Sequence, residues 1–239
     1  MKLVEKEARG RYVFVGDTHG DLDASERVFE RYQTPDTTFV FLGDYVDRGP
    51  RSKENADFLL GQRESNPDSV YLLQGNHENY MSTPLRPSNF WDSLANDEER
   101  WKYSNAFRQL PLVFSVGDII ATHGALPDVS QLKDVENIME RDRNWIATLW
   151  GNFYDFDGIF SSGGKPSFSH DYFNRVMRQV GKKVLIRGHQ PDTNISMSHR
   201  GFLTLITSNY DKGERTIAIA DFNKNKRIRS IDDLTIEII

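Results

Sequence analysis

The chain has 239 residues, with 30 lysines and arginines against 35 aspartates and glutamates, and it contains no cysteine. The absence of cysteine excludes disulfides, thiolate zinc sites and a cysteine nucleophile. The net charge of -5 does not favour nucleic acid as a partner, and no apolar stretch approaches the ~20 residues that span a bilayer, so no membrane partner is expected either. The charged N-terminus lacks the apolar core of a secretory signal, which predicts a cytoplasmic protein.

The first eighty residues alternate between patterns typical of strands and of helices. Strands are predicted at residues 12–15, 37–44 and 69–78, and helices at 22–32 and 51–64. The second strand, TTFVFLGD, is nearly continuously apolar, which indicates burial on both faces. Such β-α-β-α-β alternation implies parallel strands joined by crossover helices.

Short strand patterns dominate the second half of the chain, and turn residues separate most of them. They predict a hairpin around Gly117-Asp118 and later strands at 183–189, 202–210, 215–222 and 227–232. This arrangement favours an antiparallel or mixed sheet. No linker is visible, so we predict one domain over residues 1–239, built on two packed sheets.

Residues 144–169 are aromatic, rich in glycine and without clear periodicity. We expect a long ordered loop there, a feature that is uncommon unless it is functional. Its aromatic side chains are expected to form a small core of the loop itself, with a rim for substrate as the alternative. These side chains are Trp145, Trp150, Phe153, Tyr154 and Phe156.

Polar residues stand within two positions of a glycine at the ends of five predicted strands. They are Asp17, His19, Asp44, Asn76, His77, His123 and His189. Since ligands collect at the carboxyl ends of strands in open α/β sheets, we expect these side chains to converge at one edge. Oxygen and imidazole ligands without sulfur suit manganese, iron or zinc. Their number suits two sites that share a carboxylate, and two cations would also compensate Asp44 and Asp47, which lie close together in GDYVDRGP.

Five stretches in this order, GDTHG, GDYVDRG, GNHE, HG and RGHQ, resemble the signature of the phosphoprotein phosphatase family of metal-dependent serine/threonine phosphatases. The resemblance covers about residues 12–210 and looks closest to a compact prokaryotic-type member. It implies an α/β (α+β) architecture with the calcineurin-like metallophosphoesterase fold, a two-sheet β-sandwich flanked by helices. It also implies two divalent metal ions at the strand ends and phosphorylated proteins as substrates.

By position, the resemblance assigns six side chains to the two metals. The first metal is bound by Asp17 and His19, Asp44 bridges both, and the second is bound by Asn76, His123 and His189. Manganese is the expected metal, with iron or zinc as alternatives.

The resemblance also assigns the residues that act on the phosphate. His77 is the general acid, oriented by Asp47, while Arg48 binds phosphate and Tyr210 lines the site. The chemistry is direct in-line attack of a hydroxide bridging both metals on phosphoserine or phosphothreonine, with phosphotyrosine as an additional substrate. Two alternatives stay open: Asp47 and Arg48 could only pair with each other, and Tyr210 could be core packing.

The family usually supplies a second phosphate-binding arginine before the last histidine motif, and here that region departs from the pattern. It contains only Arg175 and Arg178, on a predicted helix, so Lys165 in SSGGKPS is a candidate substitute as a point charge. Arg187 is expected to be a structural partner of a carboxylate, and His170 and His199 are expected at the surface.

A small-molecule phosphohydrolase, such as a symmetrical dinucleoside tetraphosphatase, is the competing function. The second aspartate of GDYVDRG and the glutamate of GNHE favour protein substrates. A non-catalytic binding module would lack a ligand or the acid, and none is missing. The sequence leaves the oligomeric state open.

Overall fold

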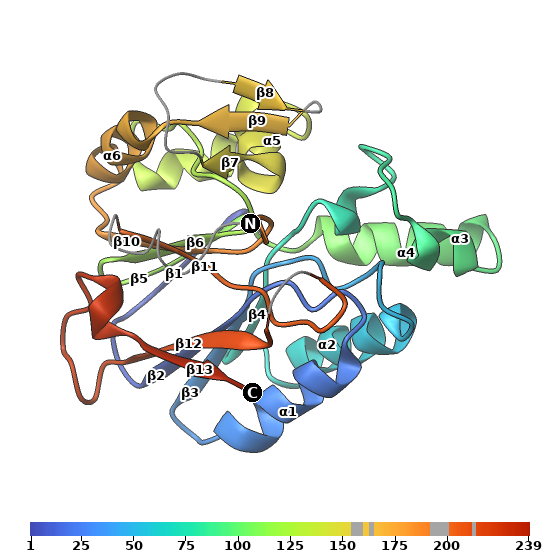
Figure 1. Ribbon diagram of the computed structural model, residues 1–239, viewed down its shortest axis with the longest axis horizontal. Coiled ribbons are helices and arrows are strands. Elements are labelled where there is room, and N and C mark those ends of the chain that lie inside the picture. The colour runs from blue at the N-terminus through green and yellow to red at the C-terminus, as the bar shows by residue number, and fades with distance from the viewer. Residues whose placement is uncertain (154–159, 163–164, 192–200, 212–213) are drawn as a thin grey trace.

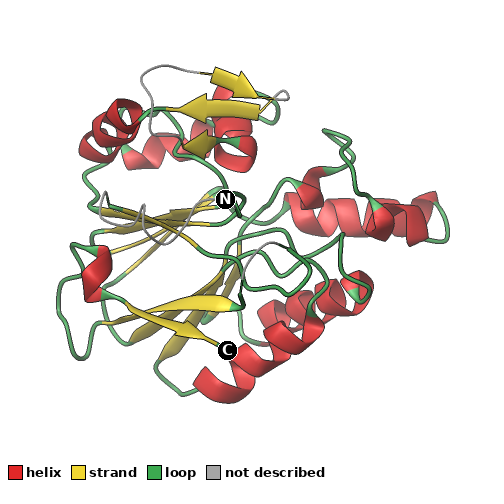
Figure 2. Ribbon diagram, in the orientation of Figure 1, coloured by secondary structure: helices red, strands yellow, loops and turns green. Residues whose placement is uncertain are grey.

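Two five-stranded sheets lie face to face in the computed structural model, with helices on their outer sides (Figure 1). The structure describes residues 1–153, 160–162, 165–191, 201–211 and 214–239. Figure 2 shows the two layers of strands in yellow between the red helices. The predicted two-sheet sandwich flanked by helices is confirmed.

One sheet contains the predicted parallel strands of the first eighty residues. Its order is β13-β12-β2-β3-β4, with β2 and β3 parallel, β3 and β4 parallel, and β12 antiparallel to both β2 and β13. The strands are β2 (Arg11–Val15), β3 (Thr37–Phe41), β4 (Val70–Leu72), β12 (Thr216–Asp221) and β13 (Thr235–Ile238). The crossover helices are α1 (Leu22–Tyr32) and α2 (Ser52–Ser65), as expected from the alternation.

The continuous apolar runs of β2 and β3 are explained by burial on both faces. Val13 and Val15 point into the core on the helix side, together with residues of α1 and α2, whereas Tyr12 and Phe14 lie in the core between the two sheets. Because side chains alternate along a strand, each face needs its own apolar set. The strand ends are thereby held in a rigid, fully packed layer.

The second sheet is mixed, as predicted, and has the order β1-β5-β6-β10-β11. Its strands are β1 (Leu3–Lys6), β5 (Val113–Val116), β6 (Ile119–Thr122), β10 (Val184–Arg187) and β11 (Phe202–Thr204). β5 and β6 form the predicted antiparallel hairpin, whose turn contains Gly117 with a φ of 54°. The other neighbouring pairs, β1 with β5, β6 with β10 and β10 with β11, are parallel.

The prediction of a long loop over residues 144–169 is wrong for most of its described part. α5 (Arg143–Trp150) is followed by a small sheet of order β7-β9-β8, made of β7 (Asn152–Phe153), β9 (Lys165–Phe168) and β8 (Phe160–Ser162). α5 begins where the Asp142 side chain accepts a hydrogen bond from the backbone N–H of Trp145, a normal N-cap. Strands of two to four residues are too short to show a period, and so the sequence pattern missed them.

The aromatic residues of this segment do not form a core of their own. Trp145 and Phe153 are buried in one cluster with Phe173 and Phe202, on the outer side of the second sheet. Phe173 belongs to α6 (His170–Gln179), the predicted helix that carries Arg175 and Arg178. Tyr154 and Phe156 lie outside the described residues.

Among the described residues, four further α-helices and strands were not predicted, and one predicted strand is absent. The unpredicted elements are β1, β13, α3 (Asn89–Ser93) and α4 (Asp97–Arg108). Residues 227–232 form a loop that leads into a short 3-10 helix, Ile231–Asp233, instead of a strand. Ile228 and Ile231 are buried there and anchor the loop.

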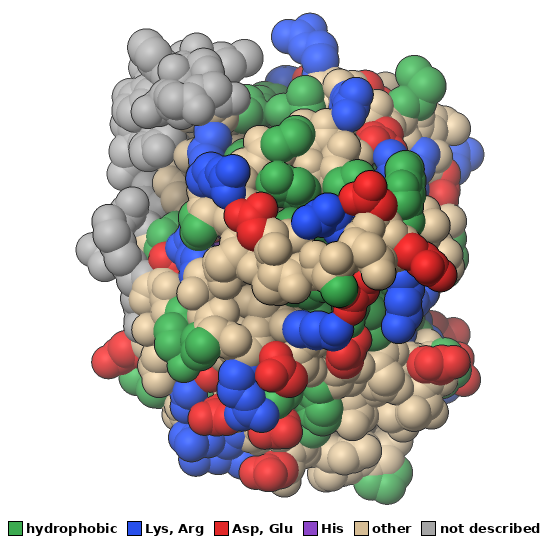
Figure 3. Space-filling view, turned by 90° about the vertical axis from the view of Figure 1, so that its right-hand side faces the viewer, with side chains coloured by type: hydrophobic (Ala, Val, Ile, Leu, Met, Phe, Trp, Pro, Cys, Tyr) green, Lys and Arg blue, Asp and Glu red, His purple; other side chains and the backbone are tan. Residues whose placement is uncertain are grey.

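The surface offers no membrane-spanning element among the residues that are described. No helix in that part of the chain combines the length and the apolar character needed to cross a bilayer. On the face that Figure 3 shows, acidic and basic side chains are intermixed and hydrophobic side chains occur in small groups.

Candidate active site

The six predicted metal ligands meet where strands of the two sheets end. Asp17 follows β2, Asp44 follows β3 and Asn76 follows β4, whereas His123 and His189 follow β6 and β10 of the other sheet. A parallel bridge between Asp17 and Ile206 links the sheets at this edge. All six side chains, including His19, are buried. Carboxylates and imidazoles gathered in this way require compensation of their charges.

The backbone at this edge has an unusual conformation. Among the described residues, six that are not glycine have a positive φ, and five of these are predicted site residues. They are His19 (43°), Asp44 (56°), Asp47 (66°), Arg48 (68°) and His189 (69°). Left-handed backbone is costly for such residues and persists where the surrounding structure enforces it, which is typical of functional sites.

Two glycines allow the backbone to pass directly beside the buried carboxylates. A Cβ atom on Gly75 would lie 2.3 Å from Asp44 Oδ1, and one on Gly188 would lie 2.1 Å from Asp17 Oδ1. Any side chain at these positions would displace the carboxylates. Gly75 and Gly188 are therefore required because the backbone at these positions lies against the carboxylates.

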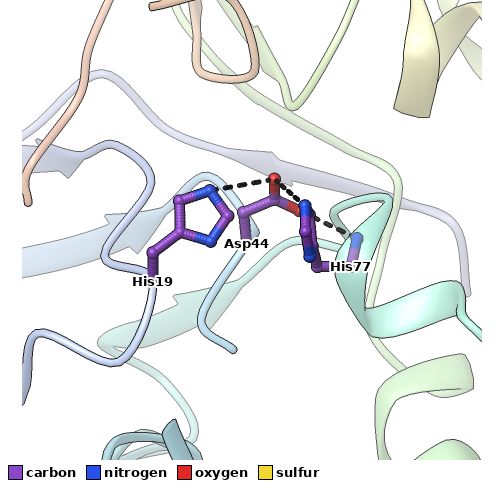
Figure 4. Close-up of side chains that lie close together, drawn as sticks. All are labelled: His19, Asp44 and His77. Atoms are coloured by element: carbon purple, nitrogen blue, oxygen red, sulfur yellow. Dashed lines mark hydrogen bonds and ion pairs between the residues drawn. The ribbon is translucent and has the colours of Figure 1, made fainter. Parts of the chain in front are cut away.

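The first group of ligand atoms surrounds His19. Its Nε2 lies 3.6 Å from Asp44 Oδ2, a contact that Figure 4 shows. The same nitrogen lies 4.0 Å from Asp17 Oδ2. Its Nδ1 is 2.9 Å from the carbonyl oxygen of Val46, which fixes the proton on Nδ1 when the ring is neutral. The lone pair of Nε2 then faces the two carboxylates, as a metal ligand requires.

The second group surrounds Asn76. Its Oδ1 lies 3.0 Å from His123 Nε2 and 2.8 Å from His189 Nδ1, while His123 Nε2 lies 3.4 Å from Asp44 Oδ1. His123 Nδ1 is 2.9 Å from the carbonyl oxygen of Leu42, an arrangement like that of His19. Asp44 thus presents one oxygen to each group, which is the geometry of a bridging carboxylate.

The donor set fits divalent cations. Among the described residues, His19 Nε2 and His189 Nε2 are buried ring nitrogens without a hydrogen-bond partner. Burial, opposed by the positive charge of His123, raises the pKa of Asp17 to about 7. Burial also acts to raise the pKa of Asp44, but the charges of His123 and His77 hold that pKa well below its usual range. Cations among these groups would compensate carboxylates that are costly to bury alone.

His77 lies beside the ligands and is held by Asp47. Its Nδ1 is 2.7 Å from Asp47 Oδ2, and the other oxygen of Asp47 accepts a hydrogen bond from the backbone N–H of Phe90. Its Nε2 lies 3.9 Å from Asp44 Oδ2, on the side of Asp44 opposite to His19 (Figure 4). Burial acts to lower the pKa of His77, but the carboxylates of Asp44 and Asp47 outweigh it and raise the pKa. A charged, oriented imidazolium is suited to general acid catalysis.

Asp211 is a site residue that the sequence pattern missed. Its side chain is 5% exposed, and its Oδ2 lies 2.5 Å from Arg48 Nη1 and 3.8 Å from His19 Nε2. Together with Asp17 and His19 it forms a third group that could hold a cation. The alternative in which Arg48 pairs only with Asp47 is wrong, because Asp47 binds His77. The only signal for Asp211 was its position after Tyr210 in TSNYD.

Glu78 was present in GNHE but had no predicted role. Its carboxylate accepts hydrogen bonds from the backbone N–H groups of Gly75, Asp44 and Tyr45, at 2.9, 2.7 and 2.7 Å. It thereby ties the end of β4 to the turn that carries Asp44. The glutamate at the end of the motif therefore holds the turn that carries Asp44 in place.

Arg48 and Tyr210 lie at the rim of the ligand cluster, where their side chains reach solvent. The Arg48 side chain is 29% exposed, and Tyr210 is 46% exposed, so the alternative of core packing for Tyr210 is wrong. A Cβ atom on Gly49 would lie 2.7 Å from Tyr210 Cδ2, which places the tyrosine ring directly beside the turn that carries Arg48. Both side chains are accessible to a ligand entering from solvent.

Neither arginine of α6 resembles a phosphate ligand. Arg175 forms a two-pronged ion pair with Asp128, at 2.8 and 3.0 Å, and Arg178 is exposed. Arg187 is buried and donates hydrogen bonds to the side-chain oxygen of Gln190 and the carbonyl oxygen of Gly151, which agrees with a structural role.

His170, which was expected at the surface, is partly covered by its neighbours. Its ring is half-buried and stacks on Phe173, with 5.9 Å between the ring centroids. Helix α6 begins at this residue, so the ring covers the buried face of the helix. His199 lies outside the described residues.

Comparison with known proteins shows which family the chain is similar to. Residues 10–192 match the profile of the family described as calcineurin-like phosphoesterase. A probable serine/threonine-protein phosphatase of Encephalitozoon cuniculi is 29% identical over 222 residues, which are 86% of this chain and 48% of that protein. The chain therefore spans about half the length of this curated relative.

Solved structures show the same fold at low sequence identity. A protein serine/threonine phosphatase from Saccharomyces cerevisiae, with similarity to human phosphatase PP5, has a TM-score of 0.83 and 23% identity, covering 99% of this chain and 82% of its own. A cold-active protein-tyrosine phosphatase of a psychrophile Shewanella has a TM-score of 0.62 and 14% identity, covering 100% and 82%. A putative diadenosine tetraphosphatase has a TM-score of 0.58 and 17% identity, covering 99% and 97%.

Proposed function

Because the chain belongs to the calcineurin-like phosphoesterase family, we propose that it is a metal-dependent protein phosphatase that hydrolyses phosphoserine and phosphothreonine monoesters. The observation that carries the proposal is the position of Asp44. Its two oxygens face separate histidine-containing ligand groups, and the imidazole of His77 lies beside it. The relative from Encephalitozoon cuniculi, named a probable serine/threonine-protein phosphatase, supports the choice of substrate class.

The site would hold two divalent ions, and we propose manganese because the ligand atoms are oxygen and nitrogen without sulfur. Asp17 and His19 would bind the first ion, Asn76, His123 and His189 the second, and Asp44 both. When bound, such ions lower the pKa of a water molecule and neutralise the phosphoryl oxygens. The buried backbone at the strand ends fixes the positions of these ligands before substrate arrives.

The chain's own residues supply binding and proton transfer. The guanidinium of Arg48 offers two parallel N–H groups to the phosphate oxygens. His77 donates the proton on Nε2 to the serine or threonine oxygen as the P–O bond breaks, and so the leaving group departs as a neutral alcohol. Asp47 accepts the Nδ1–H hydrogen bond, which keeps the ring aligned and its pKa raised.

The test is a parallel assay of the purified chain loaded with manganese. Phosphoserine, phosphothreonine and phosphotyrosine peptides are compared with a dinucleoside tetraphosphate, at equal concentrations and with zinc and iron as alternative metals. Preferential turnover of the phosphoserine and phosphothreonine peptides is expected. Preferential turnover of the dinucleotide would overturn the proposal in favour of a small-molecule phosphohydrolase, and metal analysis of the active protein identifies the ion.

A further inference from the structure

The phosphate-binding side of the site has one arginine whose charge is already compensated. Arg48 Nη1 lies 2.5 Å from Asp211 Oδ2. A phosphate monoester carries close to two negative charges near pH 7, as its second pKa is about 6. Arg175 is engaged by Asp128. Arg48 and Arg175 are therefore both paired with carboxylates, and neither offers the phosphate an uncompensated cationic side chain.

Lys165 lies at the start of β9, near the His189 end of the ligand cluster. Its Nζ is 5.8 Å from the centre of the Trp150 ring, and that ring is 6.3 Å from the ring of His189. A cation over an indole face is attracted by the ring quadrupole, which restricts the position of the ammonium group. The Trp150 ring thus contacts both Lys165 and His189, which is a predicted metal ligand.

Lys165 is half-buried, and within the described part of the chain it forms no ion pair with a carboxylate. Burial lowers its pKa, while the carboxylates of Asp44, Asp17 and Asp211 act to raise it and the charge of Arg48 acts to lower it. The charges that Lys165 faces are therefore those of the site itself. A half-buried cation without an internal counter-ion is suited to an anionic ligand.

We propose that Lys165 is the second phosphate-binding cation of this site, with Trp150 as the residue that positions it. The ligand is a phosphoryl dianion held between Arg48 on one side and Lys165 on the other. The inference rests on the proposed function only for its ligand, because the phosphoryl group is common to phosphoproteins and dinucleoside polyphosphates. Lysine is a point charge on a flexible stem, so it would accept phosphoryl groups in more than one orientation.

The experiment measures binding of inorganic phosphate to the manganese-loaded chain by isothermal titration calorimetry. Lys165→Met removes the charge and keeps an apolar stem over Trp150, whereas Lys165→Arg keeps the charge. Lys182→Met is the matched control, since Lys182 is also half-buried with a pKa lowered chiefly by burial, and its Nζ donates to the carbonyl oxygen of Gly117 at the turn between β5 and β6. Metal content and circular dichroism are recorded for every variant.

We expect Lys165→Met to weaken phosphate binding about 10- to 100-fold, the value of one charge-assisted hydrogen bond, with two metal equivalents retained. Lys165→Arg should bind within about threefold of the unaltered chain, and Lys182→Met should bind equally well. An unchanged dissociation constant for Lys165→Met would overturn the proposal. Loss of metal from Lys165→Met would overturn it as well, because Lys165 would then act through Trp150 and His189. Since phosphate is the probe, these results do not depend on which substrate class the enzyme prefers.

Discussion

The ligand cluster at the strand ends and the rim around it differ in how firmly their side chains are held. In the cluster, His19 and His123 each have a backbone carbonyl on Nδ1, and Asp44 is tied to Glu78 through its backbone N–H. At the rim, Arg48 and Tyr210 are partly exposed. The cluster is therefore fixed by the fold, whereas the rim is set by individual residues of this chain.

The difference follows from where each region comes from. The residues of the cluster directly follow strands whose registers are fixed by burial on both faces. The rim is contributed by the turn after β3, by β9 of the small sheet and by the segment after β11. Such segments vary more readily among proteins than the strands do, so we expect substrate preference to be set there.

The largest effect on metal binding and turnover is expected from Asp44→Asn, which changes the residue at the centre of the cluster. The amide has no negative charge and only one oxygen, so both ions should bind weakly. Turnover should fall about 10⁴-fold or more, because the ions supply several kcal/mol of transition-state stabilisation. Metal content after desalting, measured by mass spectrometry, should drop for both ions together. The exposed Asp23→Asn serves as the control, and one full site remaining in Asp44→Asn would contradict the bridging role.

His77→Asn tests the acid beside the cluster. Turnover should fall about 10²- to 10⁴-fold, the usual contribution of a positioned general acid. Metal content should stay at two equivalents, since the backbone N–H of His77 still donates to Asp44 Oδ1. His170→Asn provides a histidine control outside the site. Unchanged turnover would remove His77 from its role, and loss of metal would make it a structural residue.

The cluster could be predicted from the sequence because each of its residues is marked by its immediate sequence neighbours. Each ligand follows a short apolar run and stands beside a glycine, and parallel strands bring such positions to one edge. β2 and β3 show the pattern most clearly, because their faces are both buried. The one-domain organisation, the cytoplasmic location, the prokaryotic type and the absence of nucleic-acid or membrane partners stay predictions.

The rim and its supports could not be predicted because their contacts are distant in sequence. Asp211 reaches Arg48 across 163 positions of the chain, and no local pattern encodes such a pair. Glu78 accepts hydrogen bonds from backbone N–H groups, and these groups are present in almost every residue, so the sequence does not reveal them as its partners. β7 has two residues and is too short for any periodicity.

Gly188→Ala tests whether a glycine is needed at this position because the backbone lies against the Asp17 carboxylate. The new Cβ would lie 2.1 Å from Asp17 Oδ1, so the carboxylate or the end of β10 must move. We expect a loss of about 1–3 kcal/mol in the free energy of unfolding and about 10- to 100-fold weaker metal binding. Denaturant unfolding and metal titration measure both effects.

Gly61→Ala is the matched control for this substitution. Gly61 lies in α2, and a Cβ atom there meets no atom within 4 Å. Alanine should stabilise the helix by up to about 1 kcal/mol and leave metal binding unchanged. Equal behaviour of the two alanine variants would show that Gly188 is not needed for the approach to Asp17.

The smallest effect is expected at the rim, from Asp211→Asn. In the free protein the Asp211 carboxylate pairs with Arg48, so it competes with phosphate for the same guanidinium. Removing its charge should tighten binding of inorganic phosphate about 2- to 10-fold, because a partly exposed ion pair is worth at most about 1 kcal/mol and a nearby negative charge is lost as well. Asp128→Asn, which breaks the ion pair with Arg175, should leave phosphate binding unchanged. Weaker phosphate binding in Asp211→Asn would instead make Asp211 a residue that orients Arg48 for the phosphate, and the rim would then be as firmly built as the cluster.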